Sequence, residues 1–87
     1  MFRKGNRDKL EIMADIITCV MNEQDKLSHV MYRCVLSYEQ VKRYLELMTE
    51  KGLVVSKTIP ELGTMYGHTQ KGIEFRRNVL NALEMIQ

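Results

Sequence analysis

The sequence predicts one α+β domain made of helices and a single β-hairpin. Apolar residues recur at helical spacing in three segments before residue 52, a short β-branched stretch with a returning partner follows, and a long amphipathic segment closes the chain. A chain of 87 residues supports one domain, and this one contains no internal repeat, low-complexity segment or interdomain linker. We therefore treat 1–87 as a single unit, with a basic tail at 1–7 and a C-terminal helix at 69–87.

The first helix is expected from about Asp8 to Met21, where apolar side chains recur every three or four residues. Its apolar arc covers well over half of the circumference, which is wider than one packing surface requires. The helix is therefore either central in the domain or shared with a second subunit. A polar connection follows at residues 22–25, and Ser28 is a suitable N-cap for a short second helix that ends near Cys34.

The third helix has the clearest boundaries. Ser37 and Gln40 have the spacing of a capping box, in which the serine caps the backbone and the residue three positions on reaches back. Gly52, directly after Lys51, is suited to the left-handed conformation that ends many helices. The sequence thus predicts a helix that starts at Ser37 and ends near Lys51.

The second half of the chain predicts a hairpin followed by a long helix. Residues 53–57 are short and β-branched, and residues 64–68 return as their partner after a loop that contains proline and glycine. Thr69 then caps a last helix from Gln70 to about Ile86, whose apolar arc is broader than one small core covers. We therefore expect a homodimer formed through the terminal helices. Its interface residues are expected to be Ile73, Val79, Leu80, Leu83 and Ile86.

This order of elements, three helices, a β-hairpin wing and a closing dimerisation helix, is that of a winged helix-turn-helix domain. In that architecture the third helix enters the major groove of duplex DNA, which is about 12 Å wide, and the wing reaches the adjacent backbone or minor groove. The first turns of the third helix lie closest to the base edges. The fold prediction is therefore also a prediction of binding to double-stranded DNA.

Candidate DNA-binding residues are concentrated on the third helix. Lys42 and Arg43 lie on its polar face, where they either contact phosphate or a guanine edge or are solvated surface charges. Tyr38, at the first helical position, either contacts a phosphate or sugar or closes the top of the core. Ser37 is first a cap and second a phosphate ligand. Glu39 is ambiguous, since a glutamate here can accept a hydrogen bond from a cytosine amino group but would repel phosphates elsewhere.

Positive charge outside the third helix has to supply much of the attraction to DNA, because that helix carries as many glutamates as basic residues. In the hairpin, the charge of Lys57 is offset by Glu61. The first ten residues, in contrast, have an excess of basic side chains that suits them to lie along phosphates, although a solvated tail is the alternative. The remaining residues expected to contact DNA are Arg33, Lys57, Arg3, Lys4 and Arg7.

Other functional classes lack their sequence signals. There is no glycine-rich phosphate loop, serine elbow or metal-spaced cluster, and His29 and His68 have no acid or thiol at a recognisable spacing. Cys19 and Cys34 lie in unrelated contexts and are interpreted as two reduced, mostly buried thiols. Apolar runs fall far short of the ~20 residues that span a bilayer. We expect a cytoplasmic protein that is not an enzyme and has no cofactor or metal.

Several segments at fixed spacing resemble the archaeal winged-helix DNA-binding proteins of the ArnR1-like type, between about residues 7 and 76. The resemblance implies an archaeal or archaeal-virus source, DNA binding and dimers formed through the terminal helices. The relatives include predicted transcription regulators and small chromatin-type DNA-binding proteins. The segments that carry it are Leu10-Glu11-Ile12-Met13-Ala14-Asp15-Ile16-Ile17, Met31-Tyr32-Arg33, Leu36-Ser37-Tyr38-Glu39-Gln40-Val41-Lys42-Arg43-Tyr44-Leu45, Lys51-Gly52-Leu53 and Thr69-Gln70-Lys71-Gly72.

Three functions remain as hypotheses. The first is a sequence-preferring DNA-binding regulator that acts as a homodimer. The second is a winged-helix module for protein–protein association, which uses the broad apolar arcs of the first and last helices. The third is a chromatin-type protein that coats DNA with low specificity.

Overall fold

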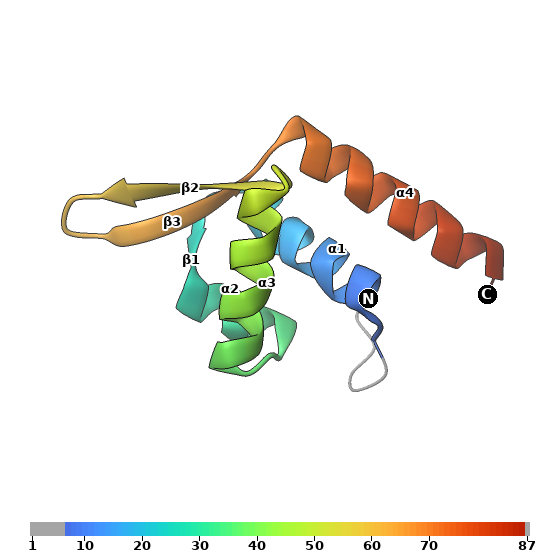
Figure 1. The fold of residues 1–87 in the computed structure, drawn as a ribbon, viewed down its shortest axis with the longest axis horizontal. Coiled ribbons are helices and arrows are strands. Elements are labelled where there is room, and N and C mark those ends of the chain that lie inside the picture. The colour runs from blue at the N-terminus through green and yellow to red at the C-terminus, as the bar shows by residue number, and fades with distance from the viewer. Residues whose placement is uncertain (1–6, 87) are drawn as a thin grey trace.

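The computed structural model describes residues 7–86. This range contains four helices and three strands, and the predicted α+β winged-helix fold is confirmed. The wing extends from one end of the molecule and α4 runs toward the other, with the remaining helices between them (Figure 1). The elements are α1 (Lys9–Met21), β1 (Asp25–Lys26), α2 (Leu27–Cys34), α3 (Tyr38–Glu50), β2 (Val54–Ile59), β3 (Gly63–His68) and α4 (Gln70–Ile86).

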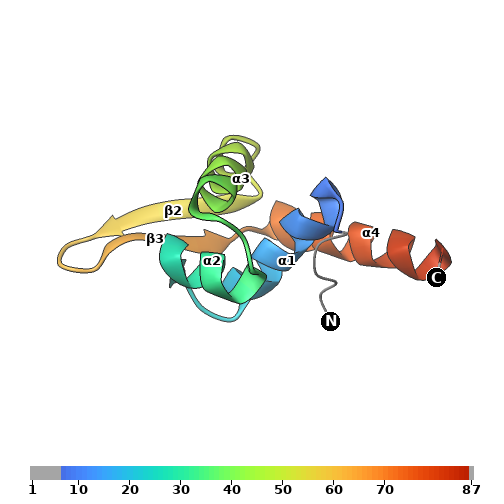
Figure 2. The same cartoon turned by 90° about the horizontal axis from the view of Figure 1, so that it is seen from below.

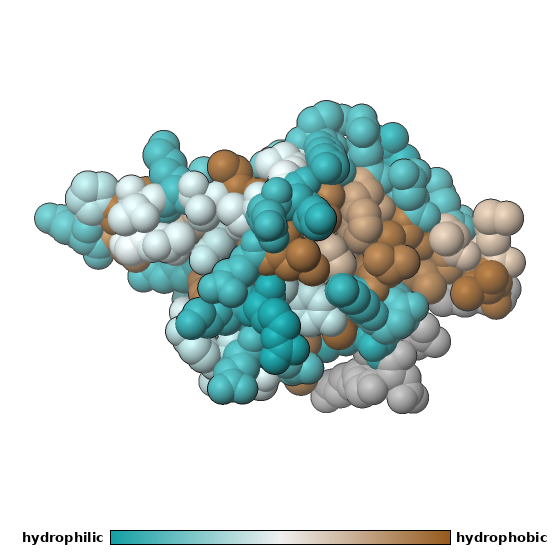
Figure 3. All heavy atoms as spheres, in the orientation of Figure 1, coloured by the Kyte–Doolittle hydropathy of each residue, from teal (hydrophilic) through white to brown (hydrophobic). Residues whose placement is uncertain are grey.

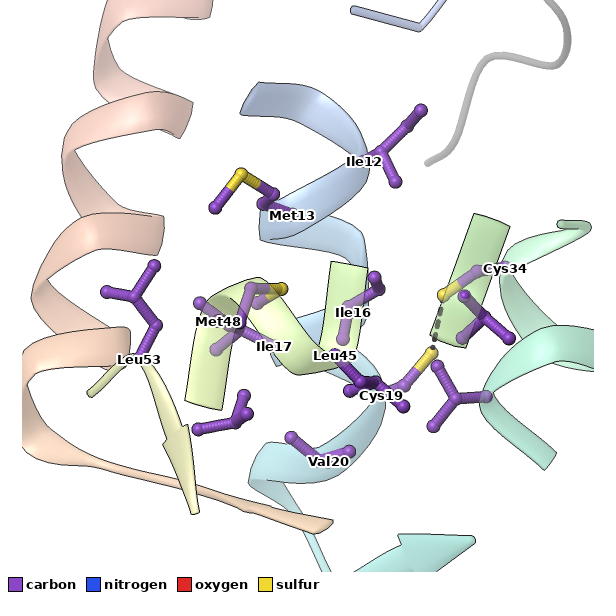
Figure 4. Close-up of a cluster of buried hydrophobic side chains, with 13 residues drawn as sticks. Ile12, Met13, Ile16, Ile17, Cys19, Val20, Cys34, Leu45, Met48 and Leu53 are labelled. Atoms are coloured by element: carbon purple, nitrogen blue, oxygen red, sulfur yellow. Dashed lines mark hydrogen bonds between the residues drawn. The ribbon is translucent and has the colours of Figure 1, made fainter. Parts of the chain in front are cut away.

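The helix α1 is the centre of the core. It packs against α2, β3 and α4, and most of its residues from Glu11 to Val20 are buried. Its broad apolar arc is therefore used inside the subunit. Of the two interpretations of that arc, a central position in the domain is the one that the structure shows. Figure 4 shows its side chains meeting those of α2, α3 and the base of β2. The buried cluster comprises Ile12, Met13, Ile16, Ile17, Cys19, Val20, Val30, Cys34, Val41, Leu45, Met48, Leu53 and Val54.

The strand β1 lies in the segment where a polar connection was predicted. Asp25 pairs with Tyr66 and Lys26 with Met65, so β1 adds a third antiparallel strand beside β3 in the order β1-β3-β2. The prediction of Ser28 as the N-cap of α2 is wrong, because the chain passes directly from this strand into the helix and Lys26 takes the capping position. The start of α2 is thereby attached to the base of the wing.

The capped start of α3 and the glycine at its end are confirmed. Gln40 N donates to Ser37 Oγ at 3.1 Å, and Ser37 N donates to Gln40 Oε1 at 3.0 Å, so both bonds of the capping box are present. Lys51 is the C-cap, and Gly52 follows it with φ +77°, a conformation that residues with a Cβ rarely adopt. The helix itself spans Tyr38–Glu50.

The start of α4 is joined to the end of α3. Thr69 Oγ1 accepts from Gly72 N at 2.9 Å, which confirms its capping role, and donates to the carbonyl oxygen of Gly52 at 2.6 Å. Lys71 Nζ donates to the carbonyl oxygen of Lys51 at 2.7 Å. A Cβ at Gly72 would clash with the carbonyl oxygen of Leu53, so only glycine allows this close approach. The end of α3 and the start of α4 are thus connected directly.

Candidate nucleic-acid interface

One face of the molecule combines the N-terminal half of α3, the start of α2 and the wing. Figure 2 shows α3 lying across the base of the wing, with the two strands of the wing reaching beyond it. A groove of about 480 Å³ runs between these elements. Its lining residues are Lys26, Leu27, Ser28, Tyr38, Lys42, Glu46, Leu62, Thr64 and Tyr66.

The predicted residues of α3 are on its solvent side. Tyr38 is 57% exposed, which excludes its alternative role of closing the core. Glu39, Lys42 and Arg43 are exposed as well. Ser37 is exposed and already accepts the capping hydrogen bond, so its hydroxyl retains a proton to donate. The structure therefore exposes all five of these side chains, and of them Tyr38 and Lys42 line the groove.

Tyr66 of β3 faces Tyr38 and Lys42 across the groove. Burial, the nearby Glu46 carboxylate and Tyr38 together raise the pKa of the Tyr66 phenol, so its hydroxyl stays protonated and can donate a hydrogen bond. Lys26 and Ser28 also line the groove, although they are absent from the predicted site. The sequence does not indicate them because it does not predict β1, whose pairing with β3 brings both residues to this face.

The wing presents mainly polar side chains. Lys57 is exposed on β2, as predicted, and lies opposite Met65 in the antiparallel register. Thr58 and Thr64 face each other across the two strands with their hydroxyl oxygens 3.5 Å apart. At the tip, Glu61 adopts φ +73° and Leu62 is exposed. The wing therefore offers hydroxyl groups and one lysine, with an acidic residue at its end.

Arg7 is a correction to the predicted set of phosphate ligands. Its side chain is only 6% exposed, and its guanidinium pairs with Asp15 at 2.8 Å. The same group donates to the carbonyl oxygen of Cys34 at 2.6 Å. The guanidinium binds inside the subunit because it joins Asp15 of α1 to the carbonyl oxygens at the end of α2. Arg3 and Lys4 lie outside the described residues.

Arg33 makes an ion pair inside the subunit but is still partly open to solvent. Its Nη1 lies 3.3 Å from Asp25 Oδ2, while the side chain remains about half exposed. Asp25 also accepts at 2.7 Å from His29 Nδ1, or shares a proton with it, and accepts from the N–H of Lys26. The expectation that His29 has no nearby acid is therefore wrong, because the direct passage from β1 into α2 brings Asp25 beside it. This polar cluster fixes the start of α2.

The apolar residues of α4 divide into two groups. Ile73 packs against the core and Val79 is buried, so these two predicted interface residues are used within the subunit, because α4 lies along α1. Leu83 is half-buried, whereas Leu80 is 41% exposed and Ile86 is 80% exposed. Figure 3 shows hydrophobic residues gathered along this end of the molecule. A second groove of about 220 Å³ lies there, lined by Asp8, Leu10, Glu11, Val79, Ala82, Leu83 and Ile86.

Within residues 7–86 the structure shows no group of three His, Cys, Asp or Glu side chains that could hold a metal ion. In the same range no helix is long and apolar enough to cross a membrane.

The chain belongs to the winged helix-turn-helix family, whose model matches residues 6–87. Among solved structures, it is similar to Sso10a-2, a DNA-binding protein from Sulfolobus solfataricus, with a TM-score of 0.82 and 24% sequence identity over 91% of this chain and 81% of the other. This match agrees with the predicted likeness to archaeal DNA-binding proteins.

The fold is also similar to ZitR from Lactococcus lactis, a zinc-responsive MarR family member, with a TM-score of 0.73 and 16% identity. That match covers 98% of this chain but 60% of ZitR, so the chain spans less than two thirds of that protein. A search of curated proteins finds no match in sequence. At these identities the likeness to solved structures shows the winged-helix fold that DNA-binding proteins use.

Proposed function

We propose that this protein binds double-stranded DNA through α3 and the wing, and that it is a cytoplasmic, non-enzymatic and sequence-preferring transcription regulator. The observation that carries the proposal is the exposed N-terminal half of α3 beside the wing, with Tyr38, Lys42 and Tyr66 around one groove. A major groove about 12 Å wide accepts one helix with its side chains, and the wing then meets the neighbouring backbone.

The charge of this face favours a regulator over a low-specificity coating protein. The basic residues Lys42, Arg43 and Lys57 are exposed there, but the acidic residues Glu39, Glu46 and Glu61 are exposed among them. A protein that coats DNA regardless of sequence depends on phosphate neutralisation for nearly all of its affinity. A nearly neutral face gains little affinity from phosphate neutralisation, so its binding relies more on contacts with the bases.

The proposal includes a homodimer formed through the terminal helices. Its support is the apolar end of α4, where Leu80, Met85 and Ile86 are exposed and Ile86 lines a groove together with Leu10 of α1. Two copies joined at this end would place their α3 helices in successive major grooves, about 34 Å apart. The same apolar surface favours the second candidate, a module that binds another protein through α4.

Selection of bound sites from a random pool of DNA duplexes tests the proposal. We expect enrichment of an inverted repeat whose half-sites are one helical turn apart. Binding without enrichment would support the coating protein instead. A mobility-shift assay at low salt completes the test, because the absence of any complex under those conditions would contradict DNA binding and support the protein-interaction module.

A further inference from the structure

The two cysteines of the chain are adjacent inside the core. Cys19 lies on α1 and Cys34 is the last residue of α2, and their Sγ atoms are 3.1 Å apart (Figure 4). Both are free thiols, with Cys19 3% exposed and Cys34 fully buried. The prediction of two reduced, mostly buried thiols is confirmed, but the two residues are neighbours in the fold and not unrelated. Their spacing of fifteen residues carries no local signal, and only the packing of α2 against α1 brings them together.

The backbone on both sides of this pair is held in place. Arg7 Nη2 donates to the carbonyl oxygen of Cys34 at 2.6 Å, and Arg33 Nη1 reaches the carbonyl oxygen of Cys19 at 3.5 Å. A disulfide has an S–S length of about 2.05 Å, so the sulfur atoms need to approach by only about 1 Å.

We propose that Cys19 and Cys34 are a site of reversible oxidation, at which a peroxide converts the two thiols into an intramolecular disulfide. This assignment does not depend on the proposed DNA binding. The bond would attach the first helix of the helix-turn-helix unit covalently to the central helix α1.

The chemistry proceeds in two balanced steps. The Cys19 thiolate attacks one peroxide oxygen and the O–O bond breaks, so Cys19 becomes a sulfenic acid. The other oxygen leaves with the bonding electron pair and takes up the proton that the Cys19 thiol gave up, which completes the reduction of the peroxide. The Cys34 sulfur then attacks the Cys19 sulfur, the S–O bond breaks, and the departing hydroxide leaves as water with the Cys34 proton. With hydrogen peroxide, two thiols and one peroxide give one disulfide and two waters.

Cys19 is the first nucleophile. The hydrogen bond with the Cys34 thiol and the Arg33 guanidinium lower the pKa of the Cys19 thiol against the opposing effect of burial. The same hydrogen bond and burial raise the pKa of Cys34, which therefore keeps its proton until the sulfenic acid has formed. Because Cys34 is already in contact, condensation to the disulfide precedes further oxidation of Cys19.

The experiment treats the full chain with a slight excess of hydrogen peroxide, unfolds it and alkylates the remaining thiols before intact-mass measurement. We expect the loss of two hydrogen atoms, no alkylation, and a monomer on a non-reducing gel. We expect the thermal midpoint to rise by roughly 10 °C, because the bond closes a short loop in the unfolded chain, and a dithiol reductant should reverse both changes. Two alkylated cysteines, or a disulfide-linked dimer, would overturn the proposal.

Three variants identify the roles of the two sulfur atoms. Cys34→Ser should accumulate a sulfenic acid on Cys19 that a dimedone probe traps, whereas Cys19→Ser should give little dimedone adduct. The double variant C19A/C34A controls for oxidation of the seven methionines, and its thermal midpoint should not rise with peroxide. An equal rise in that control would overturn the assignment. Should a variant fail to fold, the intact mass and the thermal midpoint of the unsubstituted protein still show whether the disulfide forms.

Discussion

At the scale of single residues, the turn between α2 and α3 depends on Arg7 and Val35. Val35 adopts φ 56° and ψ 58°, the left-handed region that a β-branched residue rarely occupies. Leu36 N donates to the carbonyl oxygen of Met31 at 3.1 Å, which closes the end of α2. The guanidinium of Arg7 donates hydrogen bonds to the carbonyl oxygens of Cys34 and Val35 and so holds this turn in place. Arg7 therefore stabilises a backbone conformation that the β-branched side chain of Val35 disfavours.

Val35→Gly should stabilise the protein. Glycine adopts the left-handed conformation without a Cβ clash, and the valine side chain is 60% exposed, so little apolar burial is lost. The free energy of unfolding should increase by about 1 kcal/mol, after allowance for the greater freedom of glycine in the unfolded chain. Urea unfolding measures this change. Val55→Gly, an exposed valine within β2, is the matched control and should be destabilising.

Arg7→Met should destabilise the protein by about 3 kcal/mol at neutral pH, because the buried carboxylate of Asp15 loses its partner. Burial already raises the pKa of Asp15 despite the opposing effect of Arg7, and the substitution raises it further. A folded-state pKa above the unfolded value means that the folded state binds the proton more tightly, so stability is gained as the pH falls through the folded pKa.

The deficit of Arg7→Met relative to the unsubstituted protein should therefore shrink between neutral pH and about pH 4. Urea unfolding at several pH values measures it. Lys9→Met, which removes an exposed charge two residues away, should leave the stability within about 0.5 kcal/mol of the original. A deficit that stays constant with pH would show that the ion pair with Asp15 contributes little.

At the scale of elements, α3 presents its two basic residues in different surroundings. Lys42 lies in the groove toward the wing, whereas Arg43 is exposed without lining that groove. In the proposed complex, a side chain next to the wing would lie closer to the DNA backbone, and one on the outer face of the helix would lie closer to the base edges. The two residues should therefore give different results on substitution.

Lys42→Ala should weaken binding to all duplexes alike and reduce the salt-dependence slope by about 0.9, the value for one phosphate contact. Arg43→Ala should instead reduce the discrimination between cognate and mismatched duplexes by about 1 to 3 kcal/mol. Fluorescence anisotropy over a salt series, with both duplexes, separates the two effects. Arg77→Ala removes an exposed charge from α4 and is the control. Equal, sequence-independent losses at positions 42 and 43 would contradict this division of roles.

The elements that the sequence predicted well are those with local signals. The capping box at Ser37, the glycine after α3 and the helical periodicity of α4 depend on neighbouring residues, and each is present. The strand β1 has two residues and forms only because β3 is beside it. The interior position of Arg7 likewise depends on Asp15 and on a carbonyl far along the chain, so neither feature has a recognisable pattern in the sequence.

At the scale of the whole molecule, the candidate site could be predicted in part. The position of α3 follows from the order of elements, and its polar residues are exposed as that order requires. The contributions of Lys26 and Ser28 could not be predicted, because they require the third strand and the packing of α2 beside the wing. The division of α4 into a packed half and an exposed end is also a tertiary property, since periodicity alone does not locate α1.

Leu80→Asp should weaken the proposed dimer without unfolding the subunit, because Leu80 is already partly exposed in the single chain. A charge placed in an apolar interface without a partner is costly, so we expect the dissociation constant to rise at least tenfold. Sedimentation equilibrium at micromolar concentration measures it. Asn81→Asp adds the same charge at the next exposed position of α4 and should leave the association nearly unchanged. A protein that is already monomeric would contradict the dimer.

The junction at Thr69 and Lys71 has a consequence for the DNA that the protein accepts. These residues attach α4 to the end of α3, so in the proposed dimer the distance between the two reading helices is fixed by how the C-terminal helices associate. There is no linker there to absorb a change. Each base pair inserted between two half-sites turns one of them by about 34° around the duplex, since one turn takes about 10.5 base pairs. The affinity of the protein should therefore depend on the spacing of the two half-sites as strictly as on their sequence.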